Sequence, residues 1–373
     1  MQAAPYAVRE ESGLHVRIAQ LQDRYGQLLL AALKPGDRVY YSNRDKSLLL
    51  AVIGSRPITD GVSIAAAHID SPRLDLKPNP LYEDSELAFF KTHYYGGIRK
   101  YQWVTIPLEL HGVVAKKDGT VVEVRLGEDK EPKFVITDLL PHLGGEQGRK
   151  PLNEAVPGET LNLLVGSRPI GDSEDKDRVK LHVMKRLHDK YGITESDFAS
   201  AELEAVPAAE AVDIGIDGSM IGSYGHDDRV CGYAALRALL DIETPDKTAV
   251  CVLADKEEIG SMGVTGMQSA AFDAFMSDLC DGQNVPLKAC FENAFCLSAD
   301  VTAAYDPNFA DVYEKKNAAF VNYGVGICKY TGARGKSGSS DANAETVAYV
   351  RAVLDGAGVR WQICELGKVD AGG

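Results

Sequence analysis

Apolar and polar positions alternate in two different periods along this chain, and the periods predict both helices and strands. Apolar residues at helical spacing predict helices, and short apolar runs bounded by turn residues predict strands. Helices are predicted at 14–33, 172–190, 230–241, 267–281 and 339–356. Strands are predicted at 39–54, 62–70, 248–255, 320–331 and 359–367, with a further strand ending at 300. Strands that alternate with helices indicate an α/β fold, and we expect a mixed sheet flanked by helices.

The middle third of the chain has a different pattern. From about residue 77, several strands of alternating polarity follow one another with turn residues between them. The α/β pattern returns at about residue 214. We therefore expect residues 1–76 and 214–373 to form a split α/β domain, with 77–213 inserted as a β-rich domain.

Three apolar runs end at ionisable residues. The run at 62–67 leads to His68 and Asp70, the run at 248–254 leads to Asp255, Glu257 and Glu258, and a third leads to Asp300. Ligands of open α/β sheets gather at the carboxyl ends of the strands, so these side chains are expected in one crevice.

A fourth acidic group, Asp227 and Asp228, stands directly before a predicted helix, where the helix dipole favours anions. Each group alone has an ordinary structural explanation, such as a helix cap or a solvated face. Several carboxylates at neighbouring strand ends repel one another, and a divalent cation is the simplest way to hold them together. Mixed His and carboxylate ligands suit Zn²⁺, Mn²⁺ or Co²⁺ better than Ca²⁺.

The spacing within these groups suggests which residues bind a metal, which orient a ligand and which accept a proton. In an extended segment Asp70 points the same way as His68, so it can accept the second imidazole N–H and orient a metal-binding ring. Of the two glutamates, one can bind a metal while its neighbour accepts a proton from an activated water.

Composition and motifs exclude several other classes of protein. The formal net charge of −14 argues against binding nucleic acid or anionic membranes. No apolar stretch is long enough for a membrane span, and the first residues do not resemble a secretory signal. A phosphate loop ending at Lys336 would need glycine where Tyr330 stands. HExxH and GxSxG motifs are missing. Seven cysteines without a CxxC pair favour buried, reduced thiols in a cytoplasmic protein.

Several ordered motifs resemble the M18 family of metalloaminopeptidases, the aspartyl aminopeptidase family, and most nearly its bacterial branch. They are AHIDSPRLDLKPNP, HYYGG, YQWVTIPLELHGVV, GHDDRVCGYAALRAL, DKEEIGSMG, SADVTAAYDPNF, SSDANAE and VDAGG. The resemblance implies a zinc-type peptidase that releases N-terminal residues from peptides through a water activated by two metals. It also implies that the inserted domain mediates dimerisation, and that dimers assemble into a tetrahedral dodecamer.

The resemblance also implies a role for each matching residue. His68 and Asp300 would bind one metal, Glu258 the other, and Asp227 would bridge both. Glu257 would be the general base, with Asp70 orienting His68.

Other residues receive weaker assignments. Lys329 is a candidate contact for an acidic substrate group, and His142 is a candidate for the histidine that some members supply from a neighbouring subunit. Where many members have two histidines, this chain has Ala303 and Asp306.

The resemblance leaves one ligand outside this sequence. The family's sixth ligand is a histidine beyond the Gly-rich turn, so we expect the chain to be truncated at its C-terminus and to lack that ligand. Two alternatives stay open at this point: a metal-dependent amidase or deacylase acting on N-acyl amino acids, and an inactive, truncated subunit of larger assemblies.

Overall fold

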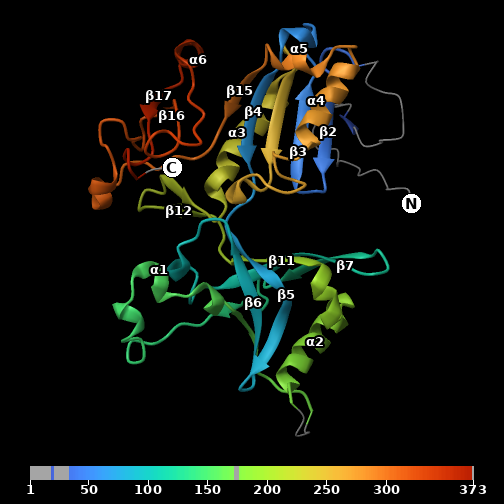
Figure 1. Ribbon diagram of the computed structural model, residues 1–373, viewed down its shortest axis with the longest axis vertical. Helices are drawn as coiled ribbons and strands as arrows, with labels where there is room; N and C mark the ends of the chain where they lie inside the picture. Colours follow the sequence, from blue (N-terminus) through green and yellow to red (C-terminus); the bar gives the residue numbers. More distant parts are fainter. Residues whose placement is uncertain (1–17, 21–32, 172–175, 372–373) are drawn as a thin grey trace. The chain divides into compact units, whose positions relative to one another are not determined.

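The computed structural model describes residues 18–20, 33–171 and 176–371. The chain divides into two compact units, residues 1–299 and 300–373, which are described separately. The first unit contains two large sheets, and the second contains a small parallel strand pair with one long helix (Figure 1).

The first sheet carries the strands that end at the candidate site residues. Its order is β1-β2-β3-β14-β4-β15. The strands are β1 (Ile18–Gln20), β2 (Arg38–Asn43), β3 (Ser47–Val52), β14 (Ala249–Ala254), β4 (Ser63–His68) and β15 (Phe295–Ser298). β14, β4 and β15 run parallel to one another, whereas β3 is antiparallel to both of its neighbours. The sheet is therefore mixed, as the sequence predicts.

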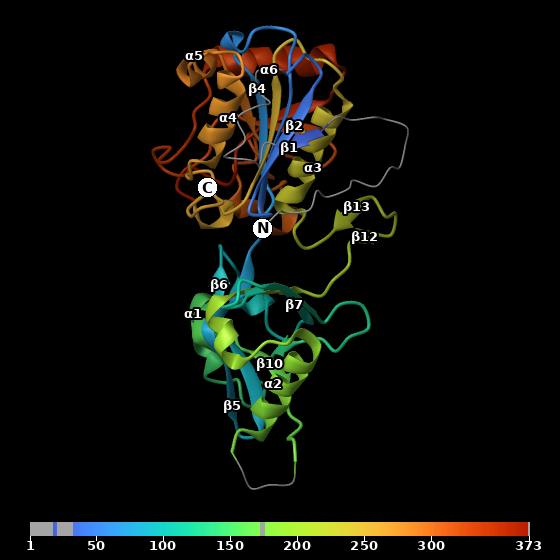
Figure 2. The ribbon, with the colours of Figure 1, turned by 90° about the vertical axis from the view of Figure 1, so that its right-hand side faces the viewer.

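Helices cover both faces of this sheet, and its central strand is therefore buried on both sides. All six residues of β14 are buried, and alternate side chains point into different cores. Val250 and Val252 pack with helices α4 (Ala271–Asp281) and α5 (Leu287–Phe291), and Cys251 and Leu253 pack with α3 (His226–Asp241). Figure 2 shows α3 and α4 on opposite sides of the strands.

The second sheet is entirely antiparallel and has seven strands in the order β8-β7-β11-β5-β6-β10-β9. In chain order they are β5 (Arg73–Asp84), β6 (Leu87–Tyr95), β7 (Leu108–Ala115), β8 (Val121–Leu126), β9 (Val135–Ile136), β10 (Leu163–Gly166) and β11 (Ala201–Pro207). Helix α2 (Arg178–Tyr191) packs on it through Val179 and Leu187, which belong to the same core as the strands.

The remaining elements are short. They are α1 (Leu152–Ala155), the strand pair β12 (Val212–Ile214) and β13 (Met220–Gly222), and the 3₁₀ turns η2 (Ile58–Asp60), η3 (Lys100–Gln102), η4 (Gln147–Arg149), η5 (Gly158–Thr160), η6 (Glu195–Ser200), η7 (Glu257–Ile259) and η8 (Pro307–Val312). The second unit contains β16 (Val325–Cys328), which pairs in parallel with β17 (Trp361–Cys364), and α6 (Ala344–Gly356).

Most of the predicted elements are confirmed, and two predictions need correction. The predicted helix at 14–33 lies mostly outside the described residues, and 18–20 form a strand that pairs with β2. Four of the seven cysteines are buried, but Cys296 and Cys328 are exposed. The prediction that the thiols are buried is therefore wrong for these two. The division of the chain at 76/77 and 213/214, with a dimerising insert, stays a prediction. No helix among the described residues is long and apolar enough to cross a membrane.

Candidate metal centre

The candidate site lies at the carboxyl end of the parallel strands of the first sheet. His68 is the last residue of β4 and is paired in register with Ala254, the last residue of β14. Glu257 and Glu258 follow within η7, the turn that begins three residues after β14. Because the two strands are parallel neighbours, their ends deliver an imidazole and a pair of carboxylates to the same edge of the sheet.

Three donor side chains converge there. His68, Asp227 and Glu258 each offer one ligand atom, and these atoms all lie within 4.8 Å of one another. Nε2 of His68 is 3.3 Å from Oδ1 of Asp227. One imidazole with two carboxylates is a donor set that suits zinc, so these residues fit a divalent transition-metal ion.

Asp227 lies in the first turn of α3, which departs from helical geometry. Asp227 and Asp228 have non-helical backbone angles, and the peptide bond between them is cis. The prediction that this pair directly precedes the regular helix is therefore confirmed. Asp228 is fully buried.

Asp70 fixes the orientation of the His68 ring. Nδ1 of His68 lies 3.0 Å from the backbone oxygen of Asp70 and 3.4 Å from its Oδ1, which leaves Nε2 facing Asp227. The Asp70 carboxylate also accepts the backbone N–H groups of Glu257 and Glu258, at 3.1 and 3.2 Å. Burial alone would raise the pKa of Asp70, but hydrogen bonds led by His68 and Tyr95 lower it to about 2. Asp70 is therefore an ionised acceptor that holds His68 together with η7, the turn that contains Glu257 and Glu258 and is called the glutamate turn below.

Sequence reasoning from the strand ends missed Tyr95, the last residue of β6. Its hydroxyl donates to Oδ2 of Asp70 at 2.6 Å, and its side chain is buried. The guanidinium of Arg73 lies 3.7 Å from the centroid of the Tyr95 ring and pairs with Asp75 and Glu204. Tyr95 lies in the HYYGG motif, which carried part of the family resemblance but no assigned role.

Gly96, in the same motif, lets β6 approach the glutamate turn. A Cβ added there would stand 3.1 Å from both Cβ and Oε2 of Glu258, and Gly96 has a φ of +76°. Both the close approach and the left-handed backbone require glycine at this position.

The two glutamates differ in their surroundings. Burial, followed by the nearby charge of Asp227, raises the pKa of Glu258 to about 7. Glu257 is half exposed, and its Oε2 is 4.0 Å from Nε2 of His68. A bound cation would favour the ionised form of Glu258, while Glu257 keeps access to water as a proton acceptor.

Asp255, the first acidic residue after β14, has a structural role. Its carboxylate accepts a hydrogen bond from the hydroxyl of Thr265 and lies 3.8 Å from Lys256. The acidic run after β14 therefore contributes two side chains to the candidate site rather than three.

Three other predicted site residues are not part of the cluster of His68, Asp227 and Glu258, and their roles stay predictions. Asp300 is the first residue of the second unit, two residues after β15, and its role stays a prediction. Lys329, in the second unit, pairs with Asp341 at 2.6 Å. His142 is exposed in a turn between β9 and η4, and among the described residues no hydrogen bond or ion pair joins it to His68.

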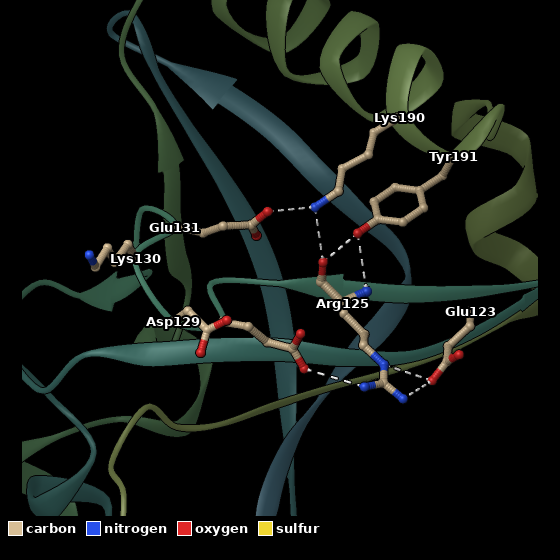
Figure 3. A pocket seen from close by; sticks show the side chains of 8 residues that line it. Glu123, Arg125, Asp129, Lys130, Glu131, Lys190 and Tyr191 are labelled. Atoms are coloured by element: carbon tan, nitrogen blue, oxygen red, sulfur yellow. Dashed lines mark hydrogen bonds and ion pairs between the residues drawn. The ribbon is translucent and has the colours of Figure 1, made fainter.

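A cavity lies elsewhere, at the antiparallel sheet. It has a volume of about 600 Å³ and lies between β8, the turn that follows it and the end of α2 (Figure 3). It is lined by Glu123, Arg125, Glu128, Asp129, Lys130, Glu131, Lys190 and Tyr191.

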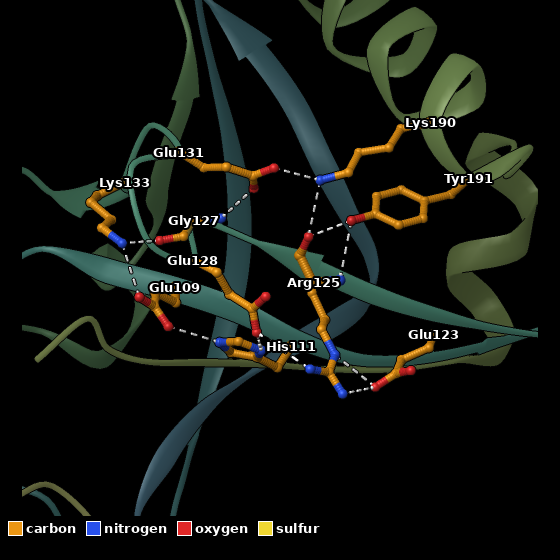
Figure 4. Close-up of polar contacts among 10 residues, drawn as sticks. All are labelled: Glu109, His111, Glu123, Arg125, Gly127, Glu128, Glu131, Lys133, Lys190 and Tyr191. Carbon is orange, nitrogen blue, oxygen red and sulfur yellow. Dashed lines mark hydrogen bonds and ion pairs between the residues drawn. The ribbon is translucent and has the colours of Figure 1, made fainter. Parts of the chain in front are cut away.

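Most of the charged groups of this cavity bind one another. Lys190 pairs with Glu131 at 2.8 Å, and Arg125 pairs with Glu123 at 2.5 Å. Figure 4 shows the network continuing through His111, which lies 3.0 Å from Glu109 and 3.6 Å from Glu128. Because these groups are paired and largely solvated, we interpret the cavity as a surface ion-pair network rather than a reaction site.

Comparison with known proteins agrees with the metal cluster. Residues 17–373 match the family described as Aminopeptidase I zinc metalloprotease (M18). The "Probable M18 family aminopeptidase 1" of Clostridium acetobutylicum is 52% identical over 346 residues, which cover 91% of this chain and 74% of that protein.

Solved structures share the fold. The crystal structure of aminopeptidase I from Clostridium acetobutylicum is 50% identical with a TM-score of 0.88, covering 92% of this chain and 76% of that one. An M18 aminopeptidase from Thermotoga maritima is 47% identical with a TM-score of 0.87, covering 92% and 77%. A yeast structure described as the mApe1 dodecamer shares the fold at 21% identity and a TM-score of 0.73, covering 94% and 78%. The chain belongs to the M18 family of zinc metalloproteases and is an aminopeptidase.

Proposed function

We propose that this aminopeptidase holds two divalent metal ions and that the residues around His68 carry the reaction. His68 and Asp300 would hold one ion, Glu258 would hold the other, and Asp227 would be shared by both. Zinc is the metal that the family description names, with manganese and cobalt as alternatives. The observation that carries the proposal is the convergence of His68, Asp227 and Glu258 within 4.8 Å, with Asp70 holding His68.

The roles of the residues follow from their positions. Bound zinc would supply a Lewis acid for the peptide carbonyl and would make hydroxide available near neutral pH. Asp70 keeps Nδ1 of His68 engaged, so Nε2 is the atom available for binding. Glu257 is close to Nε2 of His68 and half exposed, so it can accept a proton from the attacking water and return it to the leaving amine.

The test of these roles is a charge-neutral substitution of the proposed base. Glu257→Gln should leave the metal content unchanged and lower turnover of an unblocked peptide by roughly 100-fold or more, the usual scale for a lost acid–base group. Glu292→Gln, at an exposed glutamate that pairs with Lys288 outside the site, is the control and should behave as wild type. Near-normal turnover by metal-loaded Glu257→Gln would remove Glu257 from the mechanism.

The substrate class separates this enzyme from the N-acyl alternative. Aminopeptidases need a free N-terminal amine, and family membership supports that activity over a deacylase and over an inactive subunit. Release of amino acids from unblocked peptides, with none from the same peptides after N-acetylation, is the expected result. Cleavage of the acetylated peptides would restore the deacylase hypothesis.

We also infer that the enzyme forms homo-oligomers, with dimers assembling into a tetrahedral dodecamer. The yeast mApe1 dodecamer, which shares this fold, supports the inference. Native mass spectrometry of the purified chain measures the assembly directly, and a monomer at micromolar concentration would contradict it. A cytoplasmic location and a substrate contact by Lys329 or His142 stay predictions.

A further inference from the structure

Two pairs of cysteines lie close enough for their thiols to be hydrogen-bonded. One pair, Cys280 and Cys290, joins α4 to α5 in the first unit. The other pair, Cys328 and Cys364, joins the two strands of the small parallel sheet in the second unit. Neither pair has a part in the metal centre.

The second pair has the backbone geometry that a disulfide needs. Cys328 and Cys364 are the last residues of β16 and β17 and are direct register partners. Neighbouring strands are separated by about 4.8 Å, and bridged cysteines usually have Cα atoms about 4.4–6.8 Å apart. Direct register partners on neighbouring strands project their side chains to the same face of the sheet, so the two thiols lie side by side.

The two thiols of this pair differ in access and in acidity. Cys328 is exposed, and its Sγ lies 2.9 Å from the backbone oxygen of Tyr330, whereas Cys364 is completely buried. The hydrogen bond from Cys364 lowers the pKa of the Cys328 thiol below its ordinary value, although burial opposes this. The same bond raises the pKa of Cys364. Cys328 can therefore present a thiolate to a reagent in solution while Cys364 keeps its proton.

The pair in the first unit provides the contrast. Cys280 and Cys290 are both completely buried, and burial raises the pKa of both thiols. A soluble oxidant reaches neither sulfur, and neither forms a thiolate readily, so hydrogen bonding between two thiols is not enough for reactivity.

We propose that Cys328 and Cys364 are a redox modification site, which a low-molecular-weight disulfide converts reversibly into an intrachain disulfide between β16 and β17. The Cys328 thiolate attacks one sulfur of the reagent, forming a mixed disulfide and releasing one thiolate. The Cys364 thiol loses its proton and attacks Sγ of Cys328, which releases the second thiol of the reagent and closes the bridge. The protein dithiol is oxidised, the reagent is reduced to two thiols, and excess thiol reverses both steps.

The bridge would tie together the segments that follow the two strands. Tyr330, two residues after Cys328, donates its hydroxyl to Glu365, the residue after Cys364. A covalent bond between the strand ends therefore reinforces a contact that the reduced protein already makes.

The experiment treats the purified full chain with oxidised glutathione, blocks the remaining thiols by alkylation, and maps peptides by mass spectrometry without reduction. In wild type we expect a linked peptide containing Cys328 and Cys364, lighter by two hydrogen atoms than the reduced pair, that disappears after dithiothreitol. Cys280 and Cys290 should stay reduced and become alkylated only after unfolding.

Two variants identify the attacking thiol. Cys364→Ser should accumulate the glutathione adduct on Cys328, because the resolving thiol is missing. Cys328→Ser should form adduct on Cys364 more slowly by on the order of tenfold or more, since that sulfur is buried and protonated. Cys280→Ser is the matched control and should form the linked peptide as wild type does.

Other outcomes would overturn the proposal. They are a wild-type protein whose Cys328 and Cys364 are both recovered as alkylated thiols after oxidation, and a bridge that involves other cysteines. Because the wild-type map does not depend on any variant, a variant that fails to fold leaves this test intact.

Discussion

Replacing Tyr95 with phenylalanine tests whether Asp70 is held as a buried, ionised acceptor. The substitution removes only the hydroxyl that donates to Oδ2 of Asp70 at 2.6 Å and keeps the ring under Arg73. The matched control is Tyr224→Phe. It removes another partly buried hydroxyl, which donates at 2.9 Å to the neutral backbone oxygen of Pro72.

The structure sets the size of the effect. The pKa of Asp70 is lowered from 3.8 to about 2, which corresponds to roughly 2–3 kcal/mol in favour of the ionised form in the folded protein. A hydrogen bond to a charged group contributes about 1.5–3 kcal/mol and a neutral one about 0.5–1.5 kcal/mol. We therefore expect Tyr95→Phe to lower the free energy of unfolding by more than Tyr224→Phe does near neutral pH.

The pH dependence gives the sharper readout. A carboxyl group whose folded-state pKa is depressed stabilises the fold fully above its unfolded pKa, and this stability is lost as the pH falls through the folded pKa. For Asp70 that window runs from about pH 4 down to about pH 2. The deficit of Tyr95→Phe relative to wild type should therefore be constant above pH 4 and should shrink below it, while the deficit of Tyr224→Phe stays level.

The assay is urea unfolding of metal-free protein at several pH values, followed by fluorescence. A competition titration with a zinc indicator adds a second readout. Direct partners of a ligating imidazole typically change metal affinity by about 10–100-fold, so the Tyr95 hydroxyl, one hydrogen bond further away, should change it by less than about tenfold. Equal deficits in the two tyrosine variants at every pH would refute the assignment of Asp70 as an ionised acceptor held by Tyr95.

Two further predictions concern the glutamate turn. Gly96→Ala should weaken metal binding and activity, because the new Cβ would lie 3.1 Å from Glu258. The control is Gly119→Ala, which has a similar positive φ but open space around it and should change neither property. A fully active Gly96→Ala enzyme would contradict this prediction. Since the pKa of Glu258 is about 7 before metal binds, the metal must displace a proton below that pH, and apparent affinity should fall by up to about tenfold per pH unit. Isothermal titration between pH 5 and 8 measures this slope, and Glu258→Gln should flatten it; an unchanged slope in that variant would assign the proton to another group.

The sequence alone determined most of the strands of the first sheet, though not β1, and the residues that stand at their ends. β14 is a continuous apolar run, which is typical of a strand that is buried on both faces, and β4 carries a shorter apolar run from Ile64 to Ala67. The residues directly after such strands are at the sheet edge for local reasons, which is why His68, Asp70 and Glu258 could be predicted. The ordered motifs added the family and the aminopeptidase activity, which the comparisons confirm.

Only the tertiary structure decided which distant residues complete the site. Tyr95 and Gly96 meet Asp70 and Glu258 because β6 pairs with β5 in a register that places Tyr95 beside Arg73. Periodicity reports which face of a strand is buried, but it does not encode which residue of another strand lies opposite, since register depends on turns and on packing far along the chain.

The same limit explains the roles of Asp255 and of the cysteines. Asp255 resembles its acidic neighbours in sequence, yet Thr265 binds it and removes it from the donor cluster. Cys328 and Cys364 lie in separate apolar runs, and only the parallel pairing of β16 with β17 places them opposite each other. Local sequence determines the chemistry that each side chain can offer. Which of those groups meet depends on the pairing of distant strands, and burial and hydrogen bonding between distant segments determine that pairing.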